Sequence, residues 1–236
     1  MPPEPVVIVR KSAESLAIAA ASWLAAALRE AVVRRGTASL AVSGGSTPGL
    51  LFTALVDEDV AWDRLHLFQV DERIAPDGDL DRNLTELQSS LLDRVPLPST
   101  HFHPMPVTEL AEGTAEDAAD RYAALLQRAY GGVLDVVHLG LGDDGHTASL
   151  VPGDPVLDVT DRDVAITGDY RGRRRMTLTY PMLDRAGAVL WLMAGAAKAA
   201  VLPRLLAHDP SIPAGHVRNE NAVVFADEAA AAQLPT

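Results

Sequence analysis

Two carboxylates and one imidazole stand within four residues of each other in the segment Asp143-Asp144-Gly145-His146. An unperturbed imidazole titrates near pH ~6.5, so a histidine can accept a proton at neutral pH. A neighbouring carboxylate can orient the ring, as it does when an acid–histidine pair activates a nucleophile. We therefore interpret His146 as a candidate general base and Asp144 as the residue that orients it. The alternative is a histidine that only packs or caps.

A glycine-rich loop carries this pair and follows an apolar run, Val133–Leu139, that predicts a buried strand. Glycines at 140, 142 and 145 permit sharp turns and a close approach of the backbone to a ligand. The segment 140–145 also matches the dinucleotide-binding pattern Gly-x-Gly-x-x-Gly. We reject that interpretation, because two aspartates would face the pyrophosphate and Val151-Pro-Gly-Asp-Pro155 would end a following helix.

A second loop, Ser43-Gly44-Gly45-Ser46-Thr47, has the composition of an anion site. It follows an apolar strand, Ser39–Val42, and precedes a helix in which Pro48 suits the first turn. Successive backbone N–H groups at a helix N-terminus favour phosphate or carboxylate, and the hydroxyls add donors. The loop is not a nucleotide P-loop, because the Gly-Lys-Ser/Thr ending is missing. The alternative is a strand-to-helix turn that needs its glycines only for geometry.

Strands alternate with helices along the chain, which predicts one α/β domain over residues 1–236 with a mostly parallel sheet and helices on both faces. The expected strands are Val6–Val9, Ser39–Val42, Leu65–Val70, Val133–Leu139, Val164–Thr167, Met176–Thr179, Gly187–Met193 and Ala222–Phe225. The expected helices are one from a Ser12 cap to Gly36, Gly49–Val56, Leu84–Val95, Thr108–Tyr130, one ending at His208, and a short alanine-rich helix at the end.

Four loops each follow the carboxyl end of an expected parallel strand: Ser43–Thr47, Asp71–Arg73, Gly140–His146 and Gly195–Lys198. Ligands of open α/β sheets bind beyond those ends, so we expect the four loops to meet. Lys198 would be an unpaired cation there unless an anionic ligand binds. The basic run 171–175 is expected to be largely a solvated loop.

The net charge of -12 argues against nucleic-acid or anionic-membrane binding, and the chain has no cysteine for disulfides or thiolate chemistry. The run Ala17–Leu28 after Arg10-Lys11 has the length of the apolar region of a signal peptide, but its apolar residues fall on one helical face, so we expect an amphipathic surface helix. His101 and His103 alternate as metal ligands would, yet prolines flank them and no carboxylate is near in sequence, so we expect no metal there.

Taken together, Ser43–Pro48, Asp71-Glu72-Arg73, Gly140–Gly153, Arg175–Thr179 and Gly195–Ala199 resemble 6-phosphogluconolactonases, in order and over nearly the whole chain. The resemblance implies hydrolysis of 6-phospho-D-glucono-1,5-lactone in the oxidative pentose phosphate pathway, without a metal or organic cofactor. It also implies a Rossmann-like fold with extra strands (NagB/RpiA/CoA transferase-like), shared with glucosamine-6-phosphate deaminase. We expect a cytoplasmic monomer whose partner is a sugar-phosphate lactone.

The resemblance suggests roles for single residues. His146 would deprotonate the attacking water while Asp144 holds its ring, and Arg73 would stabilise the oxyanion or orient the lactone. Asp71 is a further catalytic candidate that could instead be structural. The N–H groups of Gly44, Gly45 and Ser46 would bind phosphate, with charge from Arg175 and Lys198.

Two features complicate this assignment. The resembling family usually has a serine before the asparagine of this loop, whereas here Asp81-Arg82 precede Asn83. Arg174 is adjacent to Arg175, so either could be the phosphate-binding arginine. We choose Arg175 as the phosphate-binding residue from its spacing to Thr177 and Thr179.

Three other functions fit the sequence less well. A deaminase of this fold would carry a glutamate where Val151 stands, and an aromatic residue in place of Arg73. A sugar-phosphate sensor would not need both His146 and Asp144. A serine hydrolase is less favoured, because the Gly-x-Ser-x-Gly pattern is absent around Ser43 and Ser46.

Overall fold

The computed structural model describes residues 5–108, 114–218 and 220–235 of the chain. Its main sheet has seven strands, and each neighbouring pair runs parallel. Their spatial order is β1 (Val6–Arg10), β10 (Ala222–Asp227), β9 (Ala188–Met193), β6 (Val136–Leu139), β2 (Ala38–Val42), β3 (Leu65–Gln69) and β5 (Phe102–His103). The expected mostly parallel α/β sheet is confirmed.

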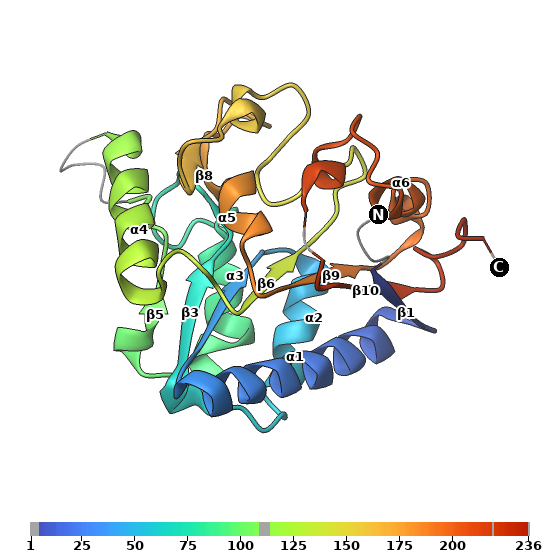
Figure 1. Cartoon of the computed structure of the whole chain (residues 1–236), viewed down its shortest axis with the longest axis horizontal. Coiled ribbons are helices and arrows are strands. Elements are labelled where there is room, and N and C mark those ends of the chain that lie inside the picture. The colour runs from blue at the N-terminus through green and yellow to red at the C-terminus, as the bar shows by residue number, and fades with distance from the viewer. Residues whose placement is uncertain (1–4, 109–113, 219, 236) are drawn as a thin grey trace.

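Helices cover both faces of this sheet, as the sequence predicted, and enclose two apolar cores (Figure 1). One face is covered by α1 (Ala13–Arg35), α2 (Ser46–Leu55) and α3 (Asn83–Ser90). The opposite face is covered by α4 (Ala115–Tyr130), α5 (Tyr180–Asp184) and α6 (Leu202–Leu206). Alternate residues of a strand therefore enter different cores: Val137 packs against the α4 side and Val136 against the α1 side.

The long helix α1 is the one helix of the described residues that is long and apolar enough to cross a membrane. Here it packs on the sheet with one face, and Leu16, Leu24 and Leu28 are buried there. Ser12 caps its start and Gly36, with φ 80°, ends it. These caps are the ones that the sequence predicted. The buried apolar residues of α1 thus form part of the core of the protein.

A second sheet was not predicted as a unit. It is antiparallel, in the order β4 (Asp71–Arg73), β8 (Arg175–Leu178) and β7 (Val164–Ile166). The segment 71–73 was expected to be a loop, but it forms a strand because β8 pairs with it directly after β3 ends. A hydrogen bond of 2.8 Å from Leu178 N to Val70 O continues the pairing toward the main sheet.

Several predicted boundaries are wrong. The helix α2 spans Ser46–Leu55 and has Pro48 in its first turn, as expected, whereas α6 ends at Leu206 after only five residues. The helix α4 begins at Ala115, after a Thr114 cap; residues 109–113 of the predicted helix lie outside the described residues. The alanine-rich segment 228–234 forms turns instead of a helix. Alanine favours helix, but this segment is too short to nucleate one without strong packing.

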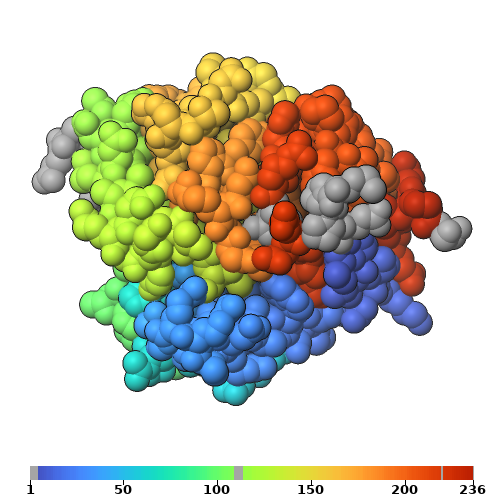
Figure 2. All heavy atoms as spheres, in the orientation of Figure 1, coloured from blue at the N-terminus to red at the C-terminus, as the bar shows by residue number. Residues whose placement is uncertain are grey.

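The two ends of the described chain lie side by side, because β1 pairs with β10. Figure 2 shows the early (blue) and late (red) segments in contact at one end of the molecule. The strands β2, β6 and β9, which precede three of the four loops expected to meet, lie in the interior of the sheet.

Candidate active site

A cleft lies at the carboxyl edge of the main sheet, where the direction of strand addition reverses. After β2 the chain adds β3 and β5 on one side, whereas after β6 it adds β9 and β10 on the other. Open α/β sheets bind ligands at this switch point. The two strands that flank it are joined by a 3.0 Å hydrogen bond from the Ser43 hydroxyl to the His138 carbonyl.

The cleft has a volume of about 350 Å³. Each of the four loops that the sequence led us to expect there contributes to its lining, with Ser43–Thr47, Asp71, Arg73, Gly140–Asp143, His146 and Lys198. Of the candidate site residues, only Asp144 does not line the cleft; it contacts His146 instead. Asn83, Arg171 and Arg175 complete the polar lining.

His146 and Asp144 form a close pair. The Nδ1 atom of His146 lies 2.5 Å from Oδ1 of Asp144, which also accepts the main-chain N–H of His146 at 3.1 Å. Since Nδ1 donates to the carboxylate, Nε2 is left with the lone pair that a general base needs. Burial by itself would raise the pKa of Asp144, but the hydrogen bonds from His146 and Tyr170 outweigh it and lower the pKa.

The loop that carries the pair is a tight backbone turn. Gly142 N donates to His146 O at 2.8 Å, and Gly145 N donates to Gly142 O at 3.1 Å. Gly145 has φ 84°, and a Cβ there would lie 2.5 Å from Ile212, so both conformation and space require glycine. Residues 146–154 form no helix, which agrees with our rejection of a dinucleotide fingerprint.

Asp71 joins β4 to the loop that follows His146. Its carboxylate accepts a 2.6 Å hydrogen bond from the Ser149 hydroxyl and a 3.3 Å bond from Asn83. The main chain of Ser149 is held in turn by the Thr177 hydroxyl at 3.2 Å. Asp71 is only 4% exposed although it lines the cleft. These contacts give Asp71 a structural function in addition to any role in chemistry.

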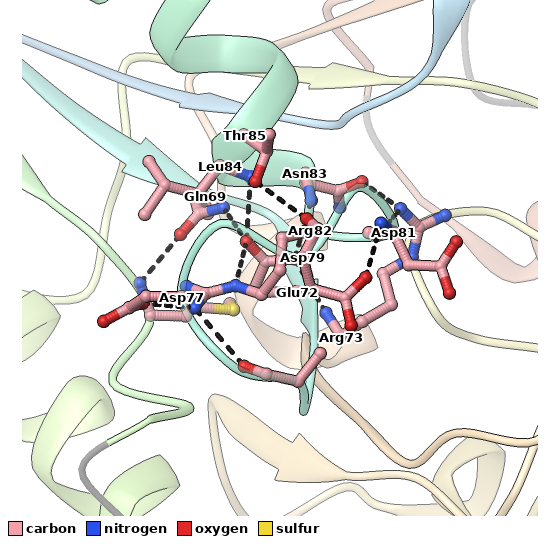
Figure 3. Close-up of polar contacts among 12 residues, drawn as sticks. Gln69, Glu72, Arg73, Asp77, Asp79, Asp81, Arg82, Asn83, Leu84 and Thr85 are labelled. Atoms are coloured by element: carbon pink, nitrogen blue, oxygen red, sulfur yellow. Dashed lines mark hydrogen bonds and ion pairs between the residues drawn. The ribbon is translucent and has the colours of Figure 1, made fainter.

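Glu72 holds the main chain of Arg73 and Asn83, two residues of the cleft lining, although the sequence gave it no predicted role. Its fully buried carboxylate accepts N–H groups of Arg73, Asn83 and Leu84 at 2.8–2.9 Å. It also pairs with the buried guanidinium of Arg82 at 3.2 Å (Figure 3). Glu72 stands in the charged run Asp71-Glu72-Arg73, so no local pattern indicated that it is buried; such a carboxylate is buried only when it is well paired.

Arg73 and Asn83 are fixed by this arrangement. The guanidinium of Arg73 donates to Asn83 Oδ1 at 2.6 Å and to the Asp81 carbonyl at 2.7 Å (Figure 3). Asn83 also lies against Gly44, where a Cβ would be 2.1 Å from Oδ1. The first glycine of the serine–glycine loop is therefore required by packing, and the loop is held close to Arg73.

Four cations line the cleft although the chain is acidic overall: Arg73, Arg171, Arg175 and Lys198. Arg175 is 8% exposed, and its Nε has no hydrogen-bond partner among the described residues. Burial and then the neighbouring Arg73 lower the pKa of Arg175, while Asp71 and Tyr170 act in the opposite direction. Two close guanidinium groups of this kind favour an anion between them.

The three arginines of the run 173–175 point to different partners. Arg173 pairs with Asp79 at 2.8 Å and Asp81 at 3.1 Å, while Arg174 pairs with Glu116 of α4. Only Arg175 of these three lines the cleft. Arg174 and Arg175 are neighbours at the start of β8 and point to opposite sides, whereas Arg173 lies in the preceding turn and is held by its ion pairs with the 79–81 segment.

Lys198 and Arg171 are the more accessible cations. Lys198 lies in the 3-10 turn Ala196–Lys198 after β9, and no ion pair joins it to a carboxylate within the described residues. Arg171 has φ 56° at the tip of the β7–β8 turn. It was expected to be solvated, and it is exposed, but it also lines the cleft.

The serine–glycine loop differs from the expected anion site in one respect. Gly45 has φ 121°, a conformation that favours glycine, and its N–H donates to Glu86 Oε2 at 3.1 Å. The expectation that this N–H binds phosphate is therefore not supported. The N–H groups of Gly44 and Ser46 stay as candidates, at the start of α2.

The histidines considered as metal ligands lie far from this cleft. His101 and His103 stack on His66 at ring-centroid distances of 4.1 and 5.3 Å. Burial, followed by the two neighbouring histidines, lowers the pKa of His103 to about 4. Within the described ranges, no group of three His, Cys, Asp or Glu side chains is placed to hold a metal ion.

Fold and cleft together define a Rossmann-like α/β protein with a cation-lined ligand site at its switch point. Residues 11–225 match the family described as Glucosamine-6-phosphate isomerases/6-phosphogluconolactonase. The chain belongs to this family.

Individual relatives agree with the family match. The chain is 37% identical over 183 residues to a 6-phosphogluconolactonase of Synechocystis sp., covering 76% of each chain. It is 36% identical to a 6-phosphogluconolactonase of Streptomyces coelicolor, covering 98% of this chain and 95% of that relative. The solved 6-phosphogluconolactonase from Trypanosoma cruzi superposes with a TM-score of 0.87 at 25% identity, covering 100% of this chain and 99% of that one.

Proposed function

We propose that the protein hydrolyses 6-phospho-D-glucono-1,5-lactone to 6-phospho-D-gluconate in the oxidative pentose phosphate pathway. The observation that carries the proposal is the His146–Asp144 pair at a cleft lined by four cations. A lactone is an activated ester, so a positioned water and a base suffice for its hydrolysis. Relatives named 6-phosphogluconolactonase along 98% of the chain support the same substrate.

In the proposed reaction, His146 removes a proton from water as the water oxygen bonds to the lactone carbonyl carbon. Asp144 holds the ring and stabilises the imidazolium that forms. The negative charge that develops on the carbonyl oxygen is stabilised by Arg73. The bond from the carbonyl carbon to the ring oxygen then breaks, and the ring oxygen takes the proton from His146. The product is the open-chain acid, which ionises in solution.

The phosphate of the substrate is proposed to bind between Arg175 and Lys198. The N–H groups of Gly44 and Ser46 at the start of α2 would complete the site. Arg175 is supported by its place in the lining of the cleft, where no carboxylate of the described residues forms an ion pair with its guanidinium. We propose that Asp71 keeps the wall of the cleft in position through Ser149 and Asn83.

A deaminase acting on glucosamine 6-phosphate is the nearest alternative. The position where such an enzyme is expected to carry a glutamate is Val151, which is 3% exposed and does not line the cleft. No carboxylate can therefore act from that position. Release of ammonia from glucosamine 6-phosphate would favour the deaminase instead.

The decisive experiment is a coupled assay on freshly generated 6-phosphogluconolactone, with spontaneous hydrolysis subtracted. We expect the protein to accelerate ring opening, and His146→Gln to abolish most turnover while affinity for 6-phosphogluconate stays close to that of the wild type. A wild-type protein that does not accelerate ring opening would refute the function. Unchanged turnover in His146→Gln would refute the base.

We also propose that the protein acts as a monomer and without a metal or organic cofactor. Water is the nucleophile and the candidate base is a side chain of the protein, so the chemistry needs no further group. Light scattering of the purified protein should give the mass of one chain, 25.0 kDa. Dialysis against a chelator should leave the turnover unchanged; a larger mass or a loss of turnover would contradict these two points.

A further inference from the structure

Tyr170 contacts Asp144 from a distant part of the chain. It lies in the turn between β7 and β8, and its hydroxyl donates to Asp144 Oδ2 at 3.0 Å. The other carboxylate oxygen, Oδ1, is the one that receives His146. Both oxygens of Asp144 therefore have a fixed partner, and the plane of the carboxylate is set from two sides.

The ring of Tyr170 also contacts groups on both sides of the cleft. Its edge-to-face contact with the His146 ring has a centroid distance of 5.9 Å and an angle of 62°. The guanidinium carbons of Arg171 and Arg175 lie 5.1 and 5.0 Å from its ring centroid. Both distances are within the range of cation–π attraction. The ring thus contacts both the candidate base and two of the cations that line the cleft.

The local backbone holds Tyr170 in this place. Tyr170 N donates to Arg173 O at 3.0 Å, and Arg173 N donates back at 3.4 Å, so the two residues close the turn. Arg173 is anchored to the opposite loop through its ion pairs with Asp79 and Asp81. The turn is therefore held by its own pairing and by salt bridges to the 79–81 segment.

We propose that Tyr170 is a positioning residue that fixes the Asp144–His146 pair and links it to the cations of the cleft. Asp144 is about one-third exposed, so without a second partner its carboxylate could rotate and release the imidazole. The hydroxyl prevents this rotation. It also stabilises the ionised carboxylate, and its hydrogen bond is one of the contacts that lower the pKa of Asp144. The aromatic face keeps Arg175 beside the base.

This inference rests on the proposed function for its kinetic readout. The charged and titratable groups around Asp144, His146 and Tyr170 come from four segments. They are Asp143 of the glycine loop, Asp71 and Arg73 of β4, Asp169, Arg171 and Arg175 of the β7–β8 turn and strand, and Lys198. Burial and then Asp144 raise the pKa of Tyr170, so it keeps the proton that it donates throughout the neutral range.

The test compares Tyr170→Phe with Tyr170→Leu in the lactone assay. Tyr170→Phe keeps the ring and loses one hydrogen bond to a charged group, so kcat should fall about tenfold with KM within about twofold of the wild type. The acid limb of the kcat/KM profile should move to higher pH, because loss of the hydrogen bond from Tyr170 raises the pKa of Asp144. Tyr170→Leu should also raise KM, since both arginines lose the ring.

Tyr130→Phe is the matched control, because Tyr130 at the end of α4 contacts His66 and Phe68 and does not line the cleft. It should leave kcat and the pH profile unchanged. Wild-type kcat and an unshifted acid limb in Tyr170→Phe would overturn the positioning role.

A second readout does not depend on activity. Carbon NMR of the Asp144 carboxyl should show its pKa raised in Tyr170→Phe, since the hydrogen bond from Tyr170 lowers that pKa in the wild type. If the wild type does not hydrolyse the lactone but the Asp144 signal shifts as expected, the proposed function fails and the contact stands. If the signal does not shift, the Tyr170 inference fails whatever the activity.

Discussion

Gly142 lies directly against the ring of His146. A Cβ added at Gly142 would be 2.1 Å from Nδ1 of His146 and 2.6 Å from Oδ1 of Asp144. Both distances are far below van der Waals contact, so a side chain there would push apart the pair that the proposed reaction needs. Gly142 is thus required because neighbouring side chains leave no room for a Cβ. Gly145 is required for the same reason and also for its positive φ.

Gly142→Ala is expected to retain the fold and to lose most of its activity. Displacement of a catalytic pair by about 1 Å can cost roughly a hundredfold in rate, so kcat should fall by about that factor. Gly140→Ala is the matched control, because nothing lies within 4 Å of a Cβ at that position. Circular dichroism should show both variants folded. Equal kcat values for the two variants would contradict the expected displacement.

Arg175 and Arg174 offer a second matched pair. Arg175→Met removes a buried cation from the cleft and should raise KM for the phosphorylated lactone roughly ten- to a hundredfold. Arg174→Met should leave KM close to the wild-type value, because Arg174 pairs with Glu116 of α4. Initial rates over a range of lactone concentrations separate the two effects. A larger rise in KM for Arg174→Met would reverse the assignment of the phosphate-binding arginine.

His138 makes the stability of the fold depend on pH. Burial in β6 lowers its pKa to about 3 from an ordinary value of 6.5. Below pH 6.5 the unfolded chain binds a proton that the native state does not bind. The free energy of unfolding therefore falls as the pH drops from about 6.5 toward 3, by up to about 1.4 kcal/mol per pH unit from this residue.

His138→Leu should reduce this pH dependence. Neither ring nitrogen of His138 has a hydrogen-bond partner among the described residues, so an apolar replacement leaves no buried partner unpaired. Urea denaturation between pH 4 and pH 7 measures the slope. His216→Gln, at an exposed position, should keep the wild-type slope. A His138→Leu slope equal to that of the wild type would contradict the prediction.

Much of the fold follows from local sequence patterns. The caps at Ser12 and Gly36 and the alternation of strands and helices were predicted, because they depend on backbone conformation and on periodic apolar residues. The strand β4 was missed, since a three-residue segment forms a strand only where a partner such as β8 is present. The length of α6 was overestimated for a similar reason: local propensity does not show where tertiary packing ends a helix.

For the candidate site, the sequence alone determined which loops line the cleft and identified His146, Asp144 and the cationic residues by type. Only the tertiary structure decided how they are used. In the structure Arg175 lines the cleft, whereas Arg174 pairs with Glu116. The Gly45 N–H donates to Glu86, and the Tyr170 hydroxyl donates to Asp144. The physical reason is distance along the chain. Gly45–Glu86 and Asp144–Tyr170 are separated by 41 and 26 residues, and such contacts depend on packing that no local pattern encodes.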